Sequence, residues 1–175
     1  MTTESMYSII TLDDAHEILS ALGIGPSSRG YQRWRRDDGF RRVDLEDVLD
    51  ESPCVLGVDW RDSLSDPVER IIDQLAEIGL AAIADLVGED QNEGTITIGD
   101  QVAKIKYVTR DNDDFDDVIA AINRLMGSNA CYRKFRSCEG ADGWSYAVLK
   151  NEDWKALASA ASSTVDLLWT DARRA

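Results

Sequence analysis

The sequence predicts an α+β fold: an antiparallel or mixed sheet of about five strands, with helices packed mainly on one face. Hydrophobic residues make up 43% of the 175 residues, which is enough to build a core. Several segments repeat apolar residues at helical spacing, whereas others alternate polar and apolar residues as half-buried strands do. A layer of helices on a sheet is the arrangement that buries both patterns.

The first quarter of the chain predicts two short helices. Residues 11–25 form the first, with an apolar stripe of Leu12, Ala15, Leu19 and Leu22. Residues 43–53 form the second, which ends before Pro53. We expect residues 1–52 to be an N-terminal helical and Arg-rich segment that packs on an α+β domain of residues 53–175.

The middle of the chain begins with a compact apolar run, residues 54–60, which predicts a buried strand. A strong helix follows, with Asp66 as its cap and Pro67 at its first position. Its apolar stripe consists of Val68, Ile71, Ile72, Leu75 and Ile78. Residues 80–87 form either a strand or a continued helix, and the strand is favoured. Gly99-Asp100 then joins two alternating runs, which predicts a tight hairpin.

The last third predicts a helix over 114–126, a hairpin of residues 130–137 and 143–150, and a closing helix capped by Asn151. The remaining tail is ambiguous. Residues 66–108 and 113–150 therefore repeat a helix–hairpin plan. Either this is an internal duplication, or it is the pattern that any helix covering a sheet requires.

The formal net charge of −14 limits the classes of partner. A body this acidic repels phosphate backbones, which disfavours nucleic acid, and attracts basic protein surfaces. No apolar run approaches the ~20 residues that span a bilayer, and the N-terminus does not look like a secretory signal. Three cysteines without a C-x-x-C pair indicate reduced thiols in a bacterial-type cytoplasm. With one histidine in the chain, a zinc site is disfavoured, and we expect no cofactor.

Residues 111–117 carry an unusual concentration of acid: Asp111, Asp113, Asp114, Asp116 and Asp117. The run fails as an EF-hand calcium loop, because Phe115 stands at its fifth position and Asp116 at its sixth. Two or three carboxylates would suit a helix N-terminus, but five repel one another. The run is therefore a helix start alone, a patch that binds a protein, or, least favoured, a metal site.

Two further acidic groups belong to this question. Glu89, Asp90 and Glu93 lie in the preceding loop and form a second candidate patch. Asp59, Asp62 and Asp66 follow the first central strand, where they form a solvated loop or contribute ligands to a metal site. A partly exposed tryptophan beside such a patch would be an interface anchor. Trp60, Trp154 and Trp169 are the candidates.

The segment 29–42 interleaves six arginines with Tyr31, Trp34 and Phe40. These residue types stack on bases and bind phosphates. An acidic chain nevertheless offers the arginines many internal partners, so internal docking or a solvated surface is favoured over a protein interface or a nucleotide site.

No nucleophile elbow, phosphate-binding loop or dinucleotide motif occurs in the sequence. The sequence therefore favours a non-enzymatic acidic module that binds a basic protein. In size, charge and lack of catalytic motifs it resembles the bacterial immunity proteins that neutralise basic toxins, which implies an inhibitor of a basic toxin. The alternative is a metal-assisted hydrolase using aspartates of 59–66 and 111–117. A weaker alternative is nucleotide or RNA binding through 29–42. The oligomeric state stays open.

Overall fold

The structure is a computed structural model that describes residues 8–108, 115–138 and 143–171. Its elements are β1 (Ile9–Ile10), α2 (Leu12–Ala21), α3 (Arg29–Trp34), β2 (Phe40–Arg41), α4 (Arg42–Leu49), β3 (Val55–Asp59), α5 (Ser65–Glu77), β4 (Ala82–Val87), β5 (Glu93–Ile98), β6 (Gln101–Lys106), α6 (Asp116–Met126), β7 (Ala130–Phe135), the 3-10 turn η1 (Arg136–Cys138), β8 (Gly143–Lys150), α7 (Asn151–Ala160), α8 (Ser162–Leu168) and β9 (Trp169–Asp171). None of the helices in these ranges is long and apolar enough to cross a membrane.

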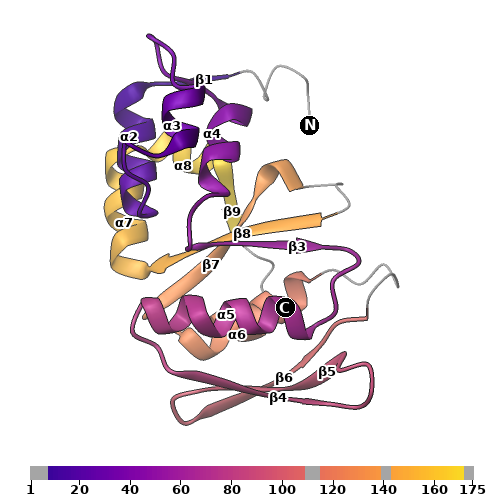
Figure 1. The fold of residues 1–175 in the computed structure, drawn as a ribbon. Helices are drawn as coiled ribbons and strands as arrows, with labels where there is room; N and C mark the ends of the chain where they lie inside the picture. Colours follow the sequence, from indigo (N-terminus) through magenta and orange to yellow (C-terminus); the bar gives the residue numbers. More distant parts are fainter. Residues whose placement is uncertain (1–7, 109–114, 139–142, 172–175) are drawn as a thin grey trace.

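The elements stack in four layers (Figure 1). Helices α2, α3, α4, α7 and α8 form the first layer, and an antiparallel sheet in the order β3-β8-β7-β9 forms the second. Helices α5 and α6 form the third layer, and a second antiparallel sheet, β4-β5-β6, forms the fourth. A short pairing of β1 with β2 completes the first layer.

The four-stranded sheet separates two hydrophobic clusters. Leu56 and Tyr146 point toward α5 and α6, whereas Ala147 and Leu149 point toward the first layer of helices. Because both faces are covered, consecutive residues of β8 are buried, from Tyr146 to Leu149. In the cluster between this sheet and the first layer, residues of α2 and α4 pack together with residues of α7 and α8.

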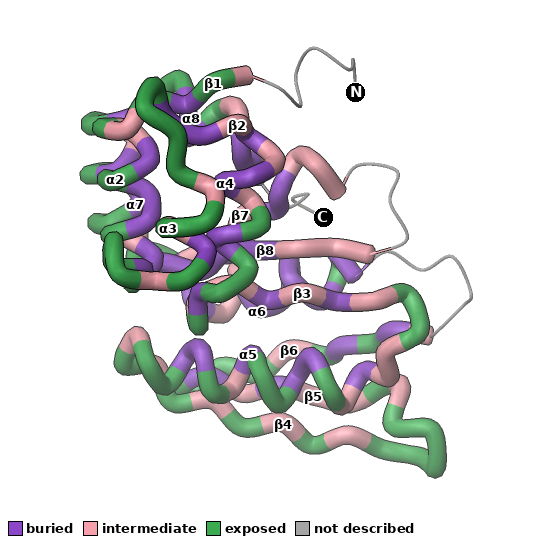
Figure 2. The backbone as a smooth tube through the Cα atoms, turned by 45° about the horizontal axis from the view of Figure 1, so that its top comes forward, coloured by how far each residue is buried: buried purple, intermediate pink, exposed green. Residues whose placement is uncertain are grey.

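The three-stranded sheet is covered on one face. Ile96, Ile98 and Ile105 pack against α5 and α6 and are at most 7% exposed. Residues of the opposite parity point away from those helices, and β4 accordingly alternates between half-buried and exposed positions (Figure 2). In the described part of the chain no further layer lies beyond this face.

The α+β class is confirmed, but the strands do not form one sheet of about five. They divide into a four-, a three- and a two-stranded sheet. The expectation of helices on mainly one face is also corrected, because the four-stranded sheet carries helices on both faces. The internal duplication is not confirmed: the strands after α5 and those after α6 enter different sheets.

Most predicted elements are present with shifted ends. Residues 82–87 form strand β4, because Gly79, with φ 84°, ends α5 before them. Helix α5 begins at Ser65, so Asp66 and Pro67 lie in its first turn, not at its cap. Asn151 is likewise the first residue of α7, and Lys150 holds the cap position. The ambiguous tail supplies α8 and β9.

Candidate functional site

One end of the molecule gathers the segments that the sequence singles out. The loop from β3 to α5 lies there, together with the loop from β4 to β5, the end of β6 and the start of α6 (Figure 1). Tyr107, directly after β6, connects them. Its hydroxyl donates to the Trp60 carbonyl oxygen at 3.4 Å, and its backbone N–H donates to the Asn92 carbonyl oxygen at 2.9 Å. We call this region, residues 59–66, 88–93, 107 and 115–117, the loop end.

Aromatic packing holds Tyr107 in this position. Its ring meets the ring of Phe115 edge to face at a centroid distance of 5.2 Å, and that of Trp144 at 6.1 Å. Tyr107 and Phe115 are 1% and 0% exposed. Tyr107, which precedes the aspartate run, and Phe115, which lies within it, are therefore fixed in the core at the loop end.

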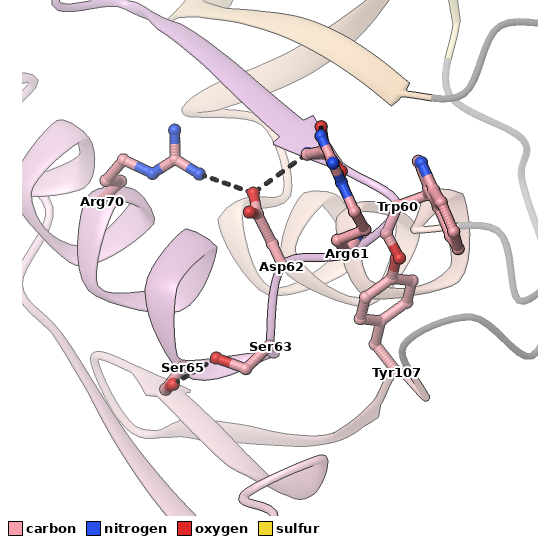
Figure 3. A network of polar contacts seen from close by, with 8 residues as sticks. Trp60, Arg61, Asp62, Ser63, Ser65, Arg70 and Tyr107 are labelled. Carbon is pink, nitrogen blue, oxygen red and sulfur yellow. Dashed lines mark hydrogen bonds and ion pairs between the residues drawn. The ribbon is translucent and has the colours of Figure 1, made fainter.

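The loop after β3 is closed by hydrogen bonds among its own residues (Figure 3). The Asp62 carboxylate accepts the backbone N–H of Asp59 at 2.9 Å and a guanidinium N–H of Arg70, in α5, at 3.4 Å. The hydroxyls of Ser63 and Ser65 lie 2.8 Å apart. Such side-chain-to-backbone bonds fix the turn before α5 begins.

The carboxyl of Asp59 has a lowered pKa. Its side-chain hydrogen bonds from Arg61, at 2.8 and 2.9 Å, and the Arg61 backbone N–H lower the pKa of the Asp59 carboxyl to about 2. Asp59 is therefore ionised at every physiological pH. Arg61 offsets part of this negative charge, and its guanidinium also lies 5.9 Å from the centre of the Trp60 ring.

Trp60 is the exposed tryptophan of the three candidate anchors. It is 38% exposed, whereas Trp154 and Trp169 are each 2% exposed. Its own backbone carbonyl is held by Tyr107. The ring is thus presented to solvent from a loop whose conformation is fixed.

The aspartates of the run have different positions. Asp111, Asp113 and Asp114 lie outside the described residues. Asp116 is 4% exposed and faces inward: its carboxylate accepts from the Lys134 ammonium at 2.8 Å and from the Tyr146 hydroxyl at 2.7 Å. Asp117, the next residue, is exposed in the first turn of α6. Asp116 therefore has an internal role, and Asp117 is available to a partner.

The second acidic patch reaches the same end. Glu89, Asp90 and Glu93 are exposed, and the adjacent Asn92 is bonded to Tyr107. Asp66 is exposed in the first turn of α5. The fold thus brings together acidic segments that are about fifty residues apart in the sequence. Local patterns gave no signal for this, because it depends on the sheet registers.

Two observations bear on the alternative functions, a metal-assisted hydrolase and nucleotide or RNA binding through residues 29–42. Within residues 8–108, 115–138 and 143–171, no three His, Cys, Asp or Glu side chains are grouped so as to hold a metal ion. The Arg/aromatic segment, for its part, is bonded to α4. Arg41 binds the buried Asp44 through two hydrogen bonds of 2.6 Å, and Arg42 binds Glu46 at 3.0 Å. Arg33 stacks on the neighbouring Trp34 at 4.8 Å.

Neither a family model, nor a curated protein, nor a solved structure matches this chain. The function is therefore inferred from the residues of the loop end.

Proposed function

We propose that this protein is a non-enzymatic binding module whose loop end binds a basic protein partner, in the manner of an immunity-type inhibitor. The observation that carries the proposal is the exposed Trp60, presented by a hydrogen-bonded loop among acidic segments. Tryptophan is enriched among the residues that contribute most to protein interfaces.

The acidic groups supply a different part of the binding free energy. Asp117, Glu89 and Asp90 are exposed around the loop end, and the chain as a whole carries a charge of −14. Such a field raises the association rate of a positively charged partner and aligns it before contact. The partner's working cleft would then be covered by the loop end, with the Trp60 ring buried at the centre of the interface.

The loop's rigidity favours tight binding. The polar groups of Asp59 and Asp62 are bonded within the loop and to α5, so little conformational entropy remains to be lost when a partner docks. This arrangement is typical of a preformed binding surface.

The proposal is tested first by capturing partners from the protein's own cells. The tagged chain is compared with Trp60→Ala and with a four-site variant, Asp111→Asn, Asp113→Asn, Asp114→Asn and Asp117→Asn. Asp116 is left unchanged because it pairs with Lys134 inside the protein. The matched control neutralises four exposed acids on α2 and α7: Asp13→Asn, Glu17→Gln, Glu152→Gln and Asp153→Asn.

We expect the wild type and the control to retain one basic protein at a one-to-one ratio, identified by mass spectrometry. With that protein purified, the four-site variant should associate at least ~10-fold more slowly at low salt and with a flatter salt dependence. Trp60→Ala should weaken the Kd about 30-fold, mainly through faster dissociation. Equal binding by all four proteins would show that the loop end is the wrong surface.

A further inference from the structure

The outer face of the β4-β5-β6 sheet exposes more large hydrophobic side chains than any other described surface of the protein. The described residues include five exposed large hydrophobic side chains, and three of them, Ile83, Val87 and Val102, lie on this face, at 70%, 49% and 60% exposure. Clustered exposed apolar groups typically mark an interaction surface. We call this surface, formed by the residues that point away from α5 and α6, the outer face.

The sheet register arranges the outer face in three rows across the strands. Ile83, Thr97 and Val102 form the first row; Asp85, Thr95 and Lys104 form the second; Val87, Glu93 and Lys106 form the third. Strand β5 supplies the middle member of each row, so β4 and β6 occupy the two sides.

The two sides match each other in chemistry. In the first row β4 has an apolar residue, Ile83, and β6 has another, Val102. In the second row β4 has an acid, Asp85, and β6 has a base, Lys104. No ion pair or side-chain hydrogen bond engages either Asp85 or Lys104 within the described residues.

The outer face also differs in charge from the rest of the protein. Its four charged residues are two acids, Asp85 and Glu93, and two bases, Lys104 and Lys106, so its formal charge is zero on a chain of −14. These two lysines are two of only five in the whole chain. A basic partner would be attracted elsewhere, whereas a second acidic copy of this chain would meet little repulsion at this neutral face.

We infer that the outer face binds the outer face of a second copy of this chain, with a two-fold axis running along β5. Such an axis lays β4 of one copy over β6 of the other. Asp85 of each copy then meets Lys104 of its partner, Ile83 meets Val102, and the threonines of β5 meet at the axis. This is the self-complementarity that an isologous two-fold interface requires.

The geometry of packed sheets agrees with these pairs. Sheets pack about 10 Å apart, a gap that the long Lys104 and the shorter Asp85 side chains bridge together. Packed sheets also cross at about 30°, so the middle row, close to the centre, is displaced least. In the third row, toward the rim, the axis along β5 places Glu93 of each copy opposite Glu93 of the other. Lys106, directly opposite Glu93 on the neighbouring strand, offsets this repulsion, and its stem can cover Val87 of the second copy.

The two edges of the sheet are less suited to pairing. Lysines on an exposed edge strand, here Lys104 and Lys106 on β6, discourage edge-to-edge pairing. The contact is therefore made face to face. Three strands of six residues cover roughly 15 by 20 Å, so the interface is smaller than the ~800 Å² per partner of stable complexes. We expect a reversible dimer with a micromolar Kd.

Sedimentation velocity of the full chain tests this from about 5 to about 500 μM, a range that brackets such a Kd. The variants are Asp85→Lys and Lys104→Asp, each compared with a matched charge reversal on an exposed helix position, Glu17→Lys and Lys155→Asp. Circular dichroism melts confirm that each variant is folded.

We expect wild type and both controls to dimerise as the concentration rises. Asp85→Lys alone and Lys104→Asp alone should stay monomeric, because like charges then face each other in both cross pairs. An equimolar mixture of these two variants should form a heterodimer, since each lysine pair then faces an aspartate pair. The double variant D85K/K104D should again form a homodimer.

A wild type that stays monomeric throughout, or a mixture that does not restore association, overturns this inference. Dimerisation that neither single variant weakens also overturns it. The test involves no other partner, and neither Asp85 nor Lys104 is substituted in the experiments on the loop end. The dimer and the proposed function can therefore fail independently.

Discussion

The two main sheets of this protein differ in how many of their faces are covered. The four-stranded sheet has helices on both sides, and β8 buries four consecutive residues, from Tyr146 to Leu149, at 4% exposure or less. The three-stranded sheet has helices on one side, and its strand β4 exposes every second residue, up to 70% at Ile83.

This difference separates the sheet that contributes most to stability from the sheet that leaves one face open to other molecules. A sheet covered on both faces contributes apolar burial from every position, so each of its residues affects folding. A sheet covered on one face buries apolar side chains at only about half of its positions. Its outward residues are available for contacts with other molecules. The first sheet thus holds the fold together, and the second presents a surface.

The largest effect on stability is expected for the buried ion pair that joins α6 to the four-stranded sheet. Asp116→Ala removes the carboxylate to which the buried Lys134 ammonium, on β7, donates, and with it an acceptor of the Tyr146 hydroxyl. We expect it to reduce the free energy of unfolding by about 3–5 kcal/mol. Urea denaturation measures this. The control Asp117→Asn, on the exposed next position, should change stability by less than about 0.5 kcal/mol.

The double variant Asp116→Leu with Lys134→Met separates charge burial from packing. It should recover part of the loss, because neither ion is then left unpaired. A double variant as unstable as Asp116→Ala would indicate that packing around Tyr146 dominates.

The comparison of the sheets is tested directly by one apolar position in each. Leu56→Ala, at a fully buried position of β3, should cost about 2–5 kcal/mol because it leaves a cavity beneath α5 and α6. Val102→Thr, on the outer face, should change the free energy of unfolding by less than about 0.5 kcal/mol. Chemical denaturation of dilute protein measures both. Similar losses at the two positions would contradict the division between stability and recognition.

The smallest effect on stability is expected at Asp59, the last residue of β3 in the four-stranded sheet. Its folded pKa, about 2, lies below its ordinary value of 3.8, so the ionised carboxylate favours the folded state. This contribution is complete above pH 4 and is lost as the pH falls toward 2. An NMR titration of the Asp59 carboxyl should therefore show an apparent pKa of about 2.

Arg61→Ala is the matched variant for this titration. Removing the guanidinium should return the pKa of Asp59 toward 3.8, because the Arg61 side-chain hydrogen bonds are the largest cause of the shift. An unchanged titration curve in Arg61→Ala would show that the backbone N–H bond alone holds the carboxylate ionised.

Much of the local structure follows from the sequence. Helices α5 and α6 are readable from their apolar stripes, and the β5–β6 hairpin from alternation around Gly99, whose φ of 62° is of the kind that glycine readily adopts. These signals are local, because a helix or a tight turn is specified by residues a few positions apart. The acidic character and the candidate patches are equally a matter of composition.

The position of each acid was not readable in this way. Asp116 and Asp117 are neighbours of the same type, yet one is buried against Lys134 and the other is exposed. The difference comes from the direction of α6 relative to β7 and β8, which no local pattern specifies. The position of the Trp60 backbone is likewise held by Tyr107, which is 47 residues away in the sequence.

The sequence by itself therefore determined the α+β class, most of the helices and strands, and a net charge of −14. Only the tertiary structure decided that the strands divide among three sheets, that several acidic segments gather at the loop end, and that Asp85 and Lys104 flank β5 on the outer face. The physical reason is that these features depend on strand pairing and layer packing between distant segments. Periodicity reports which residues are apolar, but not which partner buries them.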